Sequence, residues 1–141
     1  MSREYPDRPF VGVGAVIWRG DELLLVQRGK APRNGSWSLP GGRQELGETV
    51  RDAILREIRE ETALEVEVSG LIDVVDSVTH DADGRVRFHY TLVDFTVEWR
   101  AGVAIAGSDA AGVRWVHPDA LDEYELWEET LRIIQLSAAQ R

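Results

Sequence analysis

The sequence predicts an α/β protein in which a mixed central sheet lies between two layers of helix. Strand-like apolar runs occur on both sides of one short helix, and a second helix closes the chain. Strands before and after a helix favour a layered sandwich of the α/β/α kind. The 141 residues suit a single domain over 1–141, which is long enough to bury a substantial core.

The first two strands are expected from Phe10 to Trp18 and from Glu22 to Arg28. The first run is apolar and contains the small residues Gly12 and Gly14. This composition predicts a buried strand with another group packed close to its backbone. A Gly-Asp turn at 20–21 separates the two strands.

The loop from Gly29 to Ser36 carries cations and lies just before a glycine pair, Gly41-Gly42. Its nearness to that pair makes Arg28, Lys30 and Arg33 candidate phosphate contacts. Each of these cations, taken singly, is as readily interpreted as an ordinary exposed side chain.

A helix is predicted from Val50 to Glu61. Thr49 is a good N-cap residue, and Asp52 three positions later gives a shortened capping box. Nothing between the two ends breaks a helix, and Glu, Arg, Ala and Leu favour one.

Three carboxylates gather at the C-terminal end of this helix. Glu57 and Glu61 lie one turn apart, and Glu60 flanks them. Like charges at this spacing repel, and the helix dipole favours cations at this end, so the cluster needs a counter-charge. Mg²⁺, with Mn²⁺ as a substitute, meets that need because it takes oxygen ligands. The alternative is a solvated acidic face that Arg56 and Arg59 partly neutralise.

Two long strands are predicted after the helix, over residues 64–79 and 85–99. Asp81 to Gly84, between them, has hairpin turn chemistry. Alternate residues of the second strand share a face, and one face holds Phe88, Tyr90, Leu92, Asp94, Thr96 and Glu98. A hairpin of this length offers a surface on which a homodimer can form.

The C-terminal part is predicted to hold a loop, a short strand and a helix. Arg100 to Gly112 is rich in glycine and alanine and predicts a flexible loop. Val113 to Val116 predicts a strand, and Asp119 to Leu121 a turn. An amphipathic helix is expected from Glu125 to Ala139, with Trp127 as a packing aromatic.

Composition excludes several classes of function. The 25 acidic and 16 basic residues give a net charge of −9, which repels polymeric nucleic acid and anionic membranes. A nucleotide remains compatible, because a bound metal inverts the local potential. The chain has no cysteine, which excludes disulfides, zinc thiolates and a thiol nucleophile. It has no apolar stretch of about 20 residues and no signal peptide, so we expect a cytoplasmic protein.

The spacing of charged residues around the helix resembles a known motif. Gly42 is followed after five residues by Glu48, and after seven more by Arg56-Glu57, Ile58, Arg59 and Glu60-Glu61. This pattern is similar to the Nudix box. The match covers every charged position and departs only at Ala63, where the family has a glycine just past the helix end. A left-handed residue often closes a helix there, so alanine costs about 1 kcal/mol or the chain exits differently.

The resemblance implies a Nudix-type α/β/α sandwich and a Mg²⁺-dependent pyrophosphohydrolase that cleaves a diphosphate linked to another moiety. It places Glu57, Glu60 and Arg56 in the catalytic centre. It implies that Glu57 and Glu61 ligate metal, with Glu60 as a third ligand or the base and the carbonyl of Gly41 as a further ligand.

The resemblance also implies supporting roles. Glu48 is expected to pair with Arg56 and to orient the loop and the helix. Some members of the family use a glutamate from a later loop as the base, and Glu98 and Asp109 are the candidates for such a downstream carboxylate.

The substrate implied is a small nucleotide, either a nucleoside triphosphate, oxidised ones included, or an ADP-ribose-like compound. One alternative is a Nudix-like domain that binds a nucleotide or metabolite and regulates a partner with little or no hydrolysis. A weaker alternative is an acidic scaffold whose helix binds Ca²⁺ or nothing.

Overall fold

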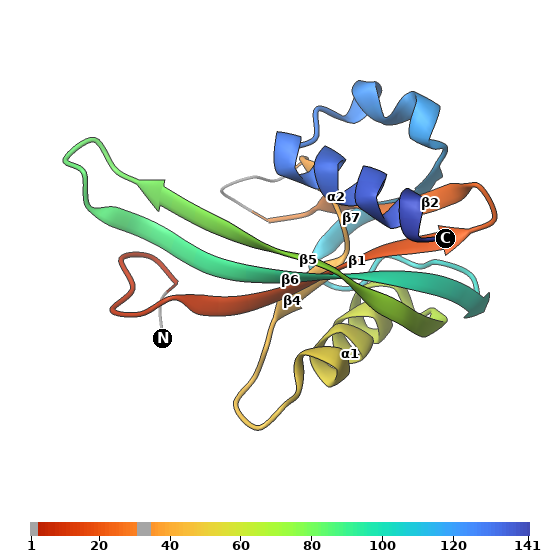
Figure 1. The fold of residues 1–141 in the computed structure, drawn as a ribbon, viewed down its shortest axis with the longest axis horizontal. Helices are drawn as coiled ribbons and strands as arrows, with labels where there is room; N and C mark the ends of the chain where they lie inside the picture. The colour runs from red at the N-terminus through yellow and green to blue at the C-terminus, as the bar shows by residue number, and fades with distance from the viewer. Residues whose placement is uncertain (1–2, 31–34) are drawn as a thin grey trace.

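A seven-stranded mixed sheet separates two helical layers (Figure 1). The computed structural model describes residues 3–30 and 35–141. The strands are β1 (Phe10–Arg19), β2 (Glu22–Arg28), β3 (Trp37–Ser38), β4 (Gly41–Arg43), β5 (Glu65–His80), β6 (Val86–Ala101) and β7 (Ala110–Val116). The helices are α1 (Val50–Thr62), the 3-10 helix η1 (Pro118–Tyr124) and α2 (Glu128–Gln140).

Strand β1 occupies the centre of the sheet. It runs parallel to β6 along one edge, and its other edge pairs antiparallel with β4 and β2. The predicted close packing against its glycines is confirmed, because side chains at positions 12 and 14 would overlap Leu92 and Asp94. Strand β1 is buried on both faces, so α1 packs on one of its faces and α2 packs on the other.

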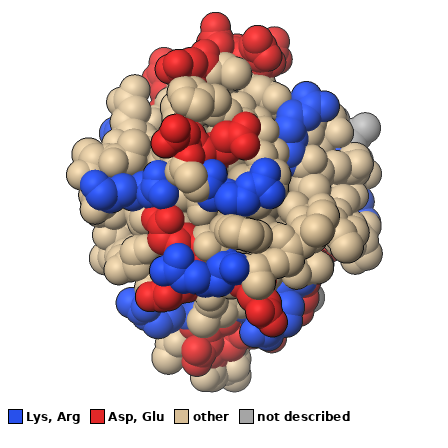
Figure 2. All heavy atoms as spheres, turned by 90° about the vertical axis from the view of Figure 1, so that its right-hand side faces the viewer, with Lys and Arg blue, Asp and Glu red and all other residues tan. Residues whose placement is uncertain are grey.

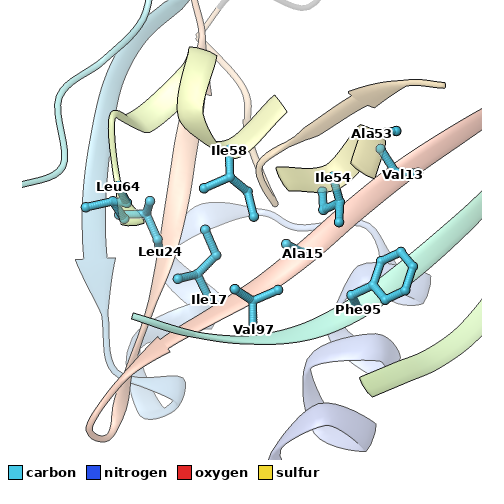
Figure 3. Close-up of a cluster of buried hydrophobic side chains, with 10 residues drawn as sticks. All are labelled: Val13, Ala15, Ile17, Leu24, Ala53, Ile54, Ile58, Leu64, Phe95 and Val97. Atoms are coloured by element: carbon cyan, nitrogen blue, oxygen red, sulfur yellow. The ribbon is translucent and has the colours of Figure 1, made fainter. Parts of the chain in front are cut away.

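The core beneath α1 is aliphatic. Ala53, Ile54 and Ile58 of the helix point toward alternate residues of β1 and β6, as Figure 3 shows. The cluster consists of Val13, Ala15, Ile17, Leu24, Ala53, Ile54, Ile58, Leu64, Phe95 and Val97. Each large aliphatic side chain buried here contributes roughly 1.5–3 kcal/mol, so α1 is held on the sheet before any polar contact is counted.

The opposite face of the sheet carries α2, which is joined to it by apolar contacts, by neutral hydrogen bonds and by the Arg132–Asp73 ion pair. Ile133 and Ile134 enter a second core cluster with Val16 and Trp18 of β1. The Trp18 indole Nε1 donates to Ser137 Oγ at 2.9 Å, within this buried layer. The two helices therefore use different faces of the same central strand.

The C-terminal part differs from the prediction in three places. Residues 118–124 form η1, and Glu125 is left-handed with φ 52°, so α2 begins at Glu128, three residues later than predicted. Trp127 is 49% exposed, so its assignment as a packing residue is wrong. Strand β7 begins at Ala110, three residues before the predicted start.

The segment predicted to be a flexible loop is in part ordered structure. Strand β6 continues to Ala101, and the connection to β7 is tied to the end of α1 by backbone hydrogen bonds. Ile105 N donates to Thr62 O at 3.0 Å, and Gly107 N donates to Glu61 O at 2.8 Å. Sequence composition alone carried no sign of these long-range bonds.

The β5–β6 hairpin is the longest feature of the molecule and extends past the helical layers in Figure 1. Strand β5 is the edge of the sheet. That a homodimer forms on this hairpin remains a prediction. Figure 2 shows acidic and basic side chains interspersed on the face at the right of Figure 1. Among the described residues, no helix combines the length and the apolar character needed to cross a membrane.

Candidate functional site

Both ends of α1 are fixed by local contacts. Thr49 is the N-cap, and its side chain accepts from Asp52 N. At the other end Ala63 is left-handed, with φ 61° and ψ 16°, and its N–H bonds to Arg59 O. Alanine therefore takes the conformation for which a glycine is usual, and the chain leaves the helix without displacing any acidic side chain.

Arg56 is the hub of the site. Its Nε donates to Glu48 Oε2 at 2.7 Å, and its Nη2 donates to Glu48 Oε1 at 3.0 Å and to Arg43 O at 3.0 Å. These bonds clamp the glycine loop to the helix. The Arg56 hydrogen bonds are also the main cause of a Glu48 pKa lowered to about 2. The structure therefore forms the Glu48–Arg56 pair that the motif implied.

The remaining Arg56 nitrogen is shared between two helix carboxylates. Nη1 donates to Glu57 Oε1 at 2.8 Å and to Glu60 Oε2 at 3.3 Å. The Glu57 carboxylate lies against Gly42, where any side chain would overlap it. Burial raises the pKa of Glu57, although Arg56 opposes the shift. The Arg56 guanidinium thus forms hydrogen bonds with three carboxylates, those of Glu48, Glu57 and Glu60.

Glu61 is turned toward the glycine loop, where its Oε2 accepts from Gly41 N at 3.2 Å. Burial raises the pKa of Glu61 to about 7, and the charges of Glu57, Asp109 and Glu60 add to the shift. Within the described residues no cation forms an ion pair with this carboxylate. Glu61 is therefore the least compensated acid of the cluster.

The two downstream candidates lie in different places. Asp109 is close enough to raise the pKa of Glu61, and it forms an ion pair with Lys30 at 2.6 Å. Glu98 lies on the other face of the sheet, where Arg141 binds it at 2.9 Å and 3.0 Å. The structure thus brings Asp109 to the cluster and keeps Glu98 away from it.

The three cations proposed to contact phosphate have separate environments. Lys30 is held by Asp109 at the rim of the cluster. The Arg28 Nε donates to Lys30 O at 3.1 Å. Arg33 lies outside the described residues.

Sequence reasoning named Asp109 as a candidate carboxylate but missed that the connection between β6 and β7, which carries it, is ordered. This connection packs on the last turn of α1 and delivers Asp109 to the cluster. A side chain at Gly107 would overlap Glu60 O, so this glycine permits the close approach. The glycine was the one signal available in the sequence, and it was interpreted as flexibility.

The donor set suits a hard divalent cation. The carboxylates of Glu57, Glu60 and Glu61, together with backbone carbonyls of the glycine loop, are the oxygen ligands that Mg²⁺ takes. In the described part of the chain no three acidic or histidine side chains converge closely enough to hold an ion. The reason is visible in the contacts, since Arg56 lies between Glu57 and Glu60 while Glu61 bonds to Gly41.

Comparison with known proteins gives a consistent family. The NUDIX domain model matches residues 8–136. An ADP-ribose pyrophosphatase of Methanocaldococcus jannaschii is 38% identical over 102 residues, covering 72% of this chain. An 8-oxo-dGTP diphosphatase of Proteus vulgaris is 35% identical over 92 residues, covering 64% of this chain and 77% of that protein. The match spans 58% of the archaeal relative's length.

Solved structures agree with the sequence comparisons. A MutT NUDIX hydrolase from Burkholderia pseudomallei superposes with a TM-score of 0.79 at 30% identity, covering 92% of this chain and 98% of that one. The predicted α/β/α fold with a mixed sheet is thereby confirmed. Together with the motif at positions 42–61 and the Glu48–Arg56 clamp, these matches show that the chain belongs to the NUDIX domain family.

Proposed function

We propose that this chain is a Mg²⁺-dependent hydrolase that cleaves a diphosphate bond in a nucleotide-type substrate by attack of water at phosphorus. The observation that carries the proposal is the shortage of positive charge around Glu57 and Glu61. Arg56 is shared among several carboxylates, and Glu61 has none of its bonds. A site built with excess negative charge on a rigid helix is suited to a cation that arrives with its substrate.

A bound divalent cation supplies neutralisation of the diphosphate and lowers the pKa of a coordinated water. Glu57 and Glu61 would hold it, with the Gly41 carbonyl as a further donor. The role of the protein's own residues is to keep these ligand oxygens in place. Arg56 holds Glu57 and the Gly41 N–H holds Glu61, so both carboxylates stay beside the glycine loop, and a cation would have to draw them closer together.

The proton of the attacking water needs an acceptor, and Glu60 is the better candidate. Its side chain is 60% exposed and has a single long bond to Arg56, at 3.3 Å. Asp109 is the weaker base, because the Lys30 hydrogen bond and charge lower its pKa. We therefore assign the base to Glu60 and propose that Asp109 positions Lys30 toward the phosphates.

The substrate class follows from charge and family together. Lys30 and Arg28 stand at the rim of the carboxylate cluster, where cations can bind a phosphate that the metal does not cover. The similar proteins named above act on ADP-ribose or on 8-oxo-dGTP, so both types of compound belong in the first screen.

The test is a hydrolysis screen with product identification, with and without Mg²⁺, over ADP-ribose, dinucleoside polyphosphates, nucleotide sugars, and normal and oxidised nucleoside triphosphates. We expect metal-dependent turnover of one class, and the products identify the phosphorus attacked. Nucleotide binding without turnover across the panel would contradict the proposal and favour the regulatory domain instead.

A further inference from the structure

Asp94 of β6 is a buried acidic residue whose carboxylate has no hydrogen-bond or ion-pair partner within the described residues. Four polar or charged residues of the described chain are buried, namely Thr62, Asp94, Thr96 and Ser137. The three hydroxyl residues all take part in hydrogen bonds. Asp94 is 7% exposed, and no hydrogen bond or ion pair within the described residues involves its carboxylate. A buried carboxylate without a partner is costly to the fold, so its presence calls for a reason.

The cation that acts on Asp94 is committed elsewhere. Burial and then the charge of Asp73 raise the pKa of Asp94 to about 6, and the charge of Arg132 of α2 opposes this shift. Arg132 donates instead to Asp73 at 3.0 Å and to Glu129 at 2.8 Å. Asp94 is therefore not part of the contacts that hold α2 on the sheet.

The sheet register places Asp94 in line with the glycine loop. Asp94 pairs with Gly14, and Gly14 pairs with Gly41 on its other side. A side chain at position 14 would overlap Asp94 Oδ1 and would lie 3.9 Å from Pro40 O, so the carboxylate lies over β1 toward the 40–41 bend. Two strand spacings, about 10 Å, separate Asp94 from Gly41, which is comparable with the length of a nucleoside.

A second unpartnered group lies on the same face. Arg43 pairs with Gly12, one alternate position along β1 from Gly14. Its Nη1 is the buried side-chain atom of the described residues that has no hydrogen-bond partner, and its guanidinium lies 4.8 Å from the centre of the Phe10 ring. An acceptor and a donor thus both lack hydrogen-bond partners within the described residues, on either side of Gly12 and Gly14 of β1.

We propose that Asp94 binds the nucleoside end of the substrate and accepts hydrogen bonds from two adjacent donors on it. This inference rests on the proposed function, which places the diphosphate at Gly41 and the carboxylates of α1. A carboxylate offers two acceptor oxygens, so its natural complement is a pair of neighbouring donors. A nucleotide offers such a pair in two places, the N1–H and 2-amino group of guanine and the 2′,3′-hydroxyls of ribose.

The test is calorimetric binding of GMP, AMP, 2′-deoxy-GMP and ribose 5-phosphate, in Mg²⁺, to the wild type and to Asp94→Asn. The substitution keeps the shape and removes the charge and one acceptor. We expect at least tenfold weaker binding of the preferred probe. A loss confined to GMP and 2′-deoxy-GMP assigns the base edge. An equal loss for GMP, AMP and ribose 5-phosphate, with 2′-deoxy-GMP already weak in the wild type, assigns the sugar.

Two further variants separate binding from structure. Asp73→Asn removes a carboxylate from the same face and should leave the affinities unchanged while weakening the hold on Arg132. Gly14→Ala pushes the Asp94 carboxylate aside and should weaken binding as Asp94→Asn does. Without ligand, Asp94→Asn should melt at a higher temperature than the wild type, because an uncompensated charge is gone.

Unchanged affinities in Asp94→Asn, or no binding of any probe to the wild type, would overturn the inference. Neither readout requires turnover. Absent hydrolysis with Asp94-dependent binding would therefore sink the proposed reaction alone, and hydrolysis with Asp94-independent binding would sink this inference alone.

Discussion

The polar groups beneath α1 and those beneath α2 are satisfied in opposite ways. Under α2 a chain of neutral bonds runs from Trp18 to Ser137, Thr96 and Gln140, whose Nε2 ends on Leu71 O. Each donor there meets an acceptor. Under α1 the Arg56 guanidinium donates to several carboxylates, and within the described residues Glu61 accepts only from one backbone N–H.

The contrast separates contacts that hold a helix in place from charged groups that are suited to bind a cation. A fully satisfied neutral network fixes the position of a helix and is indifferent to ions. An under-compensated charged cluster weakens the fold until something positive binds. The same central strand supports both, with the Trp18–Ser137–Thr96 hydrogen-bond chain on the α2 face and the Glu57, Glu60 and Glu61 carboxylates on the α1 face.

The largest effect should come from the carboxylates themselves. Glu57→Gln and Glu61→Gln should each lower turnover by two orders of magnitude or more, because each removes a charged oxygen donor from the cation site. Neither should lower the melting temperature of the metal-free protein. Glu65→Gln, an exposed acid just past the helix, is the matched control and should keep full activity. A folded Glu57→Gln or Glu61→Gln protein with wild-type turnover would contradict the assignment of these carboxylates to a metal site.

Arg56→Lys probes the clamp that keeps the charged cluster together. Lysine cannot make the paired bonds to Glu48, so we expect a loss on the order of 2 kcal/mol in urea unfolding. Turnover should fall as well, since Glu57 loses its anchor. Arg132→Lys, at a more exposed clamp on α2, is the control. Equal losses of unfolding free energy for the two variants would mean that the Arg56 clamp stabilises the fold no more than the Arg132 contacts do.

Ser137→Ala breaks the neutral chain in its middle. It leaves the buried Trp18 N–H and the Thr96 hydroxyl each without one partner, and should cost about 1–2 kcal/mol of unfolding free energy. Turnover should not change. Combined with Thr96→Val, the loss should be smaller than the sum of the two single losses, because both act on one chain. Additive losses would show that these bonds are independent.

The smallest expected effect is the pH dependence of stability, which depends on the buried carboxylates and not on the neutral hydrogen-bond chain. Burial raises the pKa of Glu61 from 4.5 to about 7, so the folded state binds more protons than the unfolded state in that window. Metal-free stability should therefore decrease as pH rises from about 4.5 to about 7, by on the order of 1 kcal/mol. Asp94 and Glu57, whose pKa values are also raised, act in the same direction. Glu61→Gln should flatten the slope, whereas Ser137→Ala should leave it intact. Wild-type stability that is constant across the window would contradict the burial of Glu61.

Local signals predicted most of the α1 layer. Thr49 begins the helix as predicted, and Ala63 adopts the left-handed end that the motif required. The pairing of Glu48 with Arg56 also followed from the motif. These features depend on residues close in sequence, where capping and helical spacing decide the outcome.

Long-range bonds decided the rest. The order in residues 102–109 comes from bonds to α1 carbonyls some forty residues earlier, which composition cannot show. Strand alternation grouped Glu98 with Thr96, but only the packing of α2 shows that these two residues contact the end of that helix and not the carboxylates of α1. That Asp94 has no hydrogen-bond partner among the residues the structure describes likewise becomes visible only once the sheet is assembled.

The indole of Trp18 gives the molecule an internal reporter. Its N–H is 2.9 Å from Ser137 Oγ and its side chain is 2% exposed, so solvent deuterium reaches it only when α2 lifts from the sheet. Its exchange rate would measure the opening of that layer alone. Slow exchange in a variant that has lost the α1 clamp would mean that the two faces of one strand loosen separately.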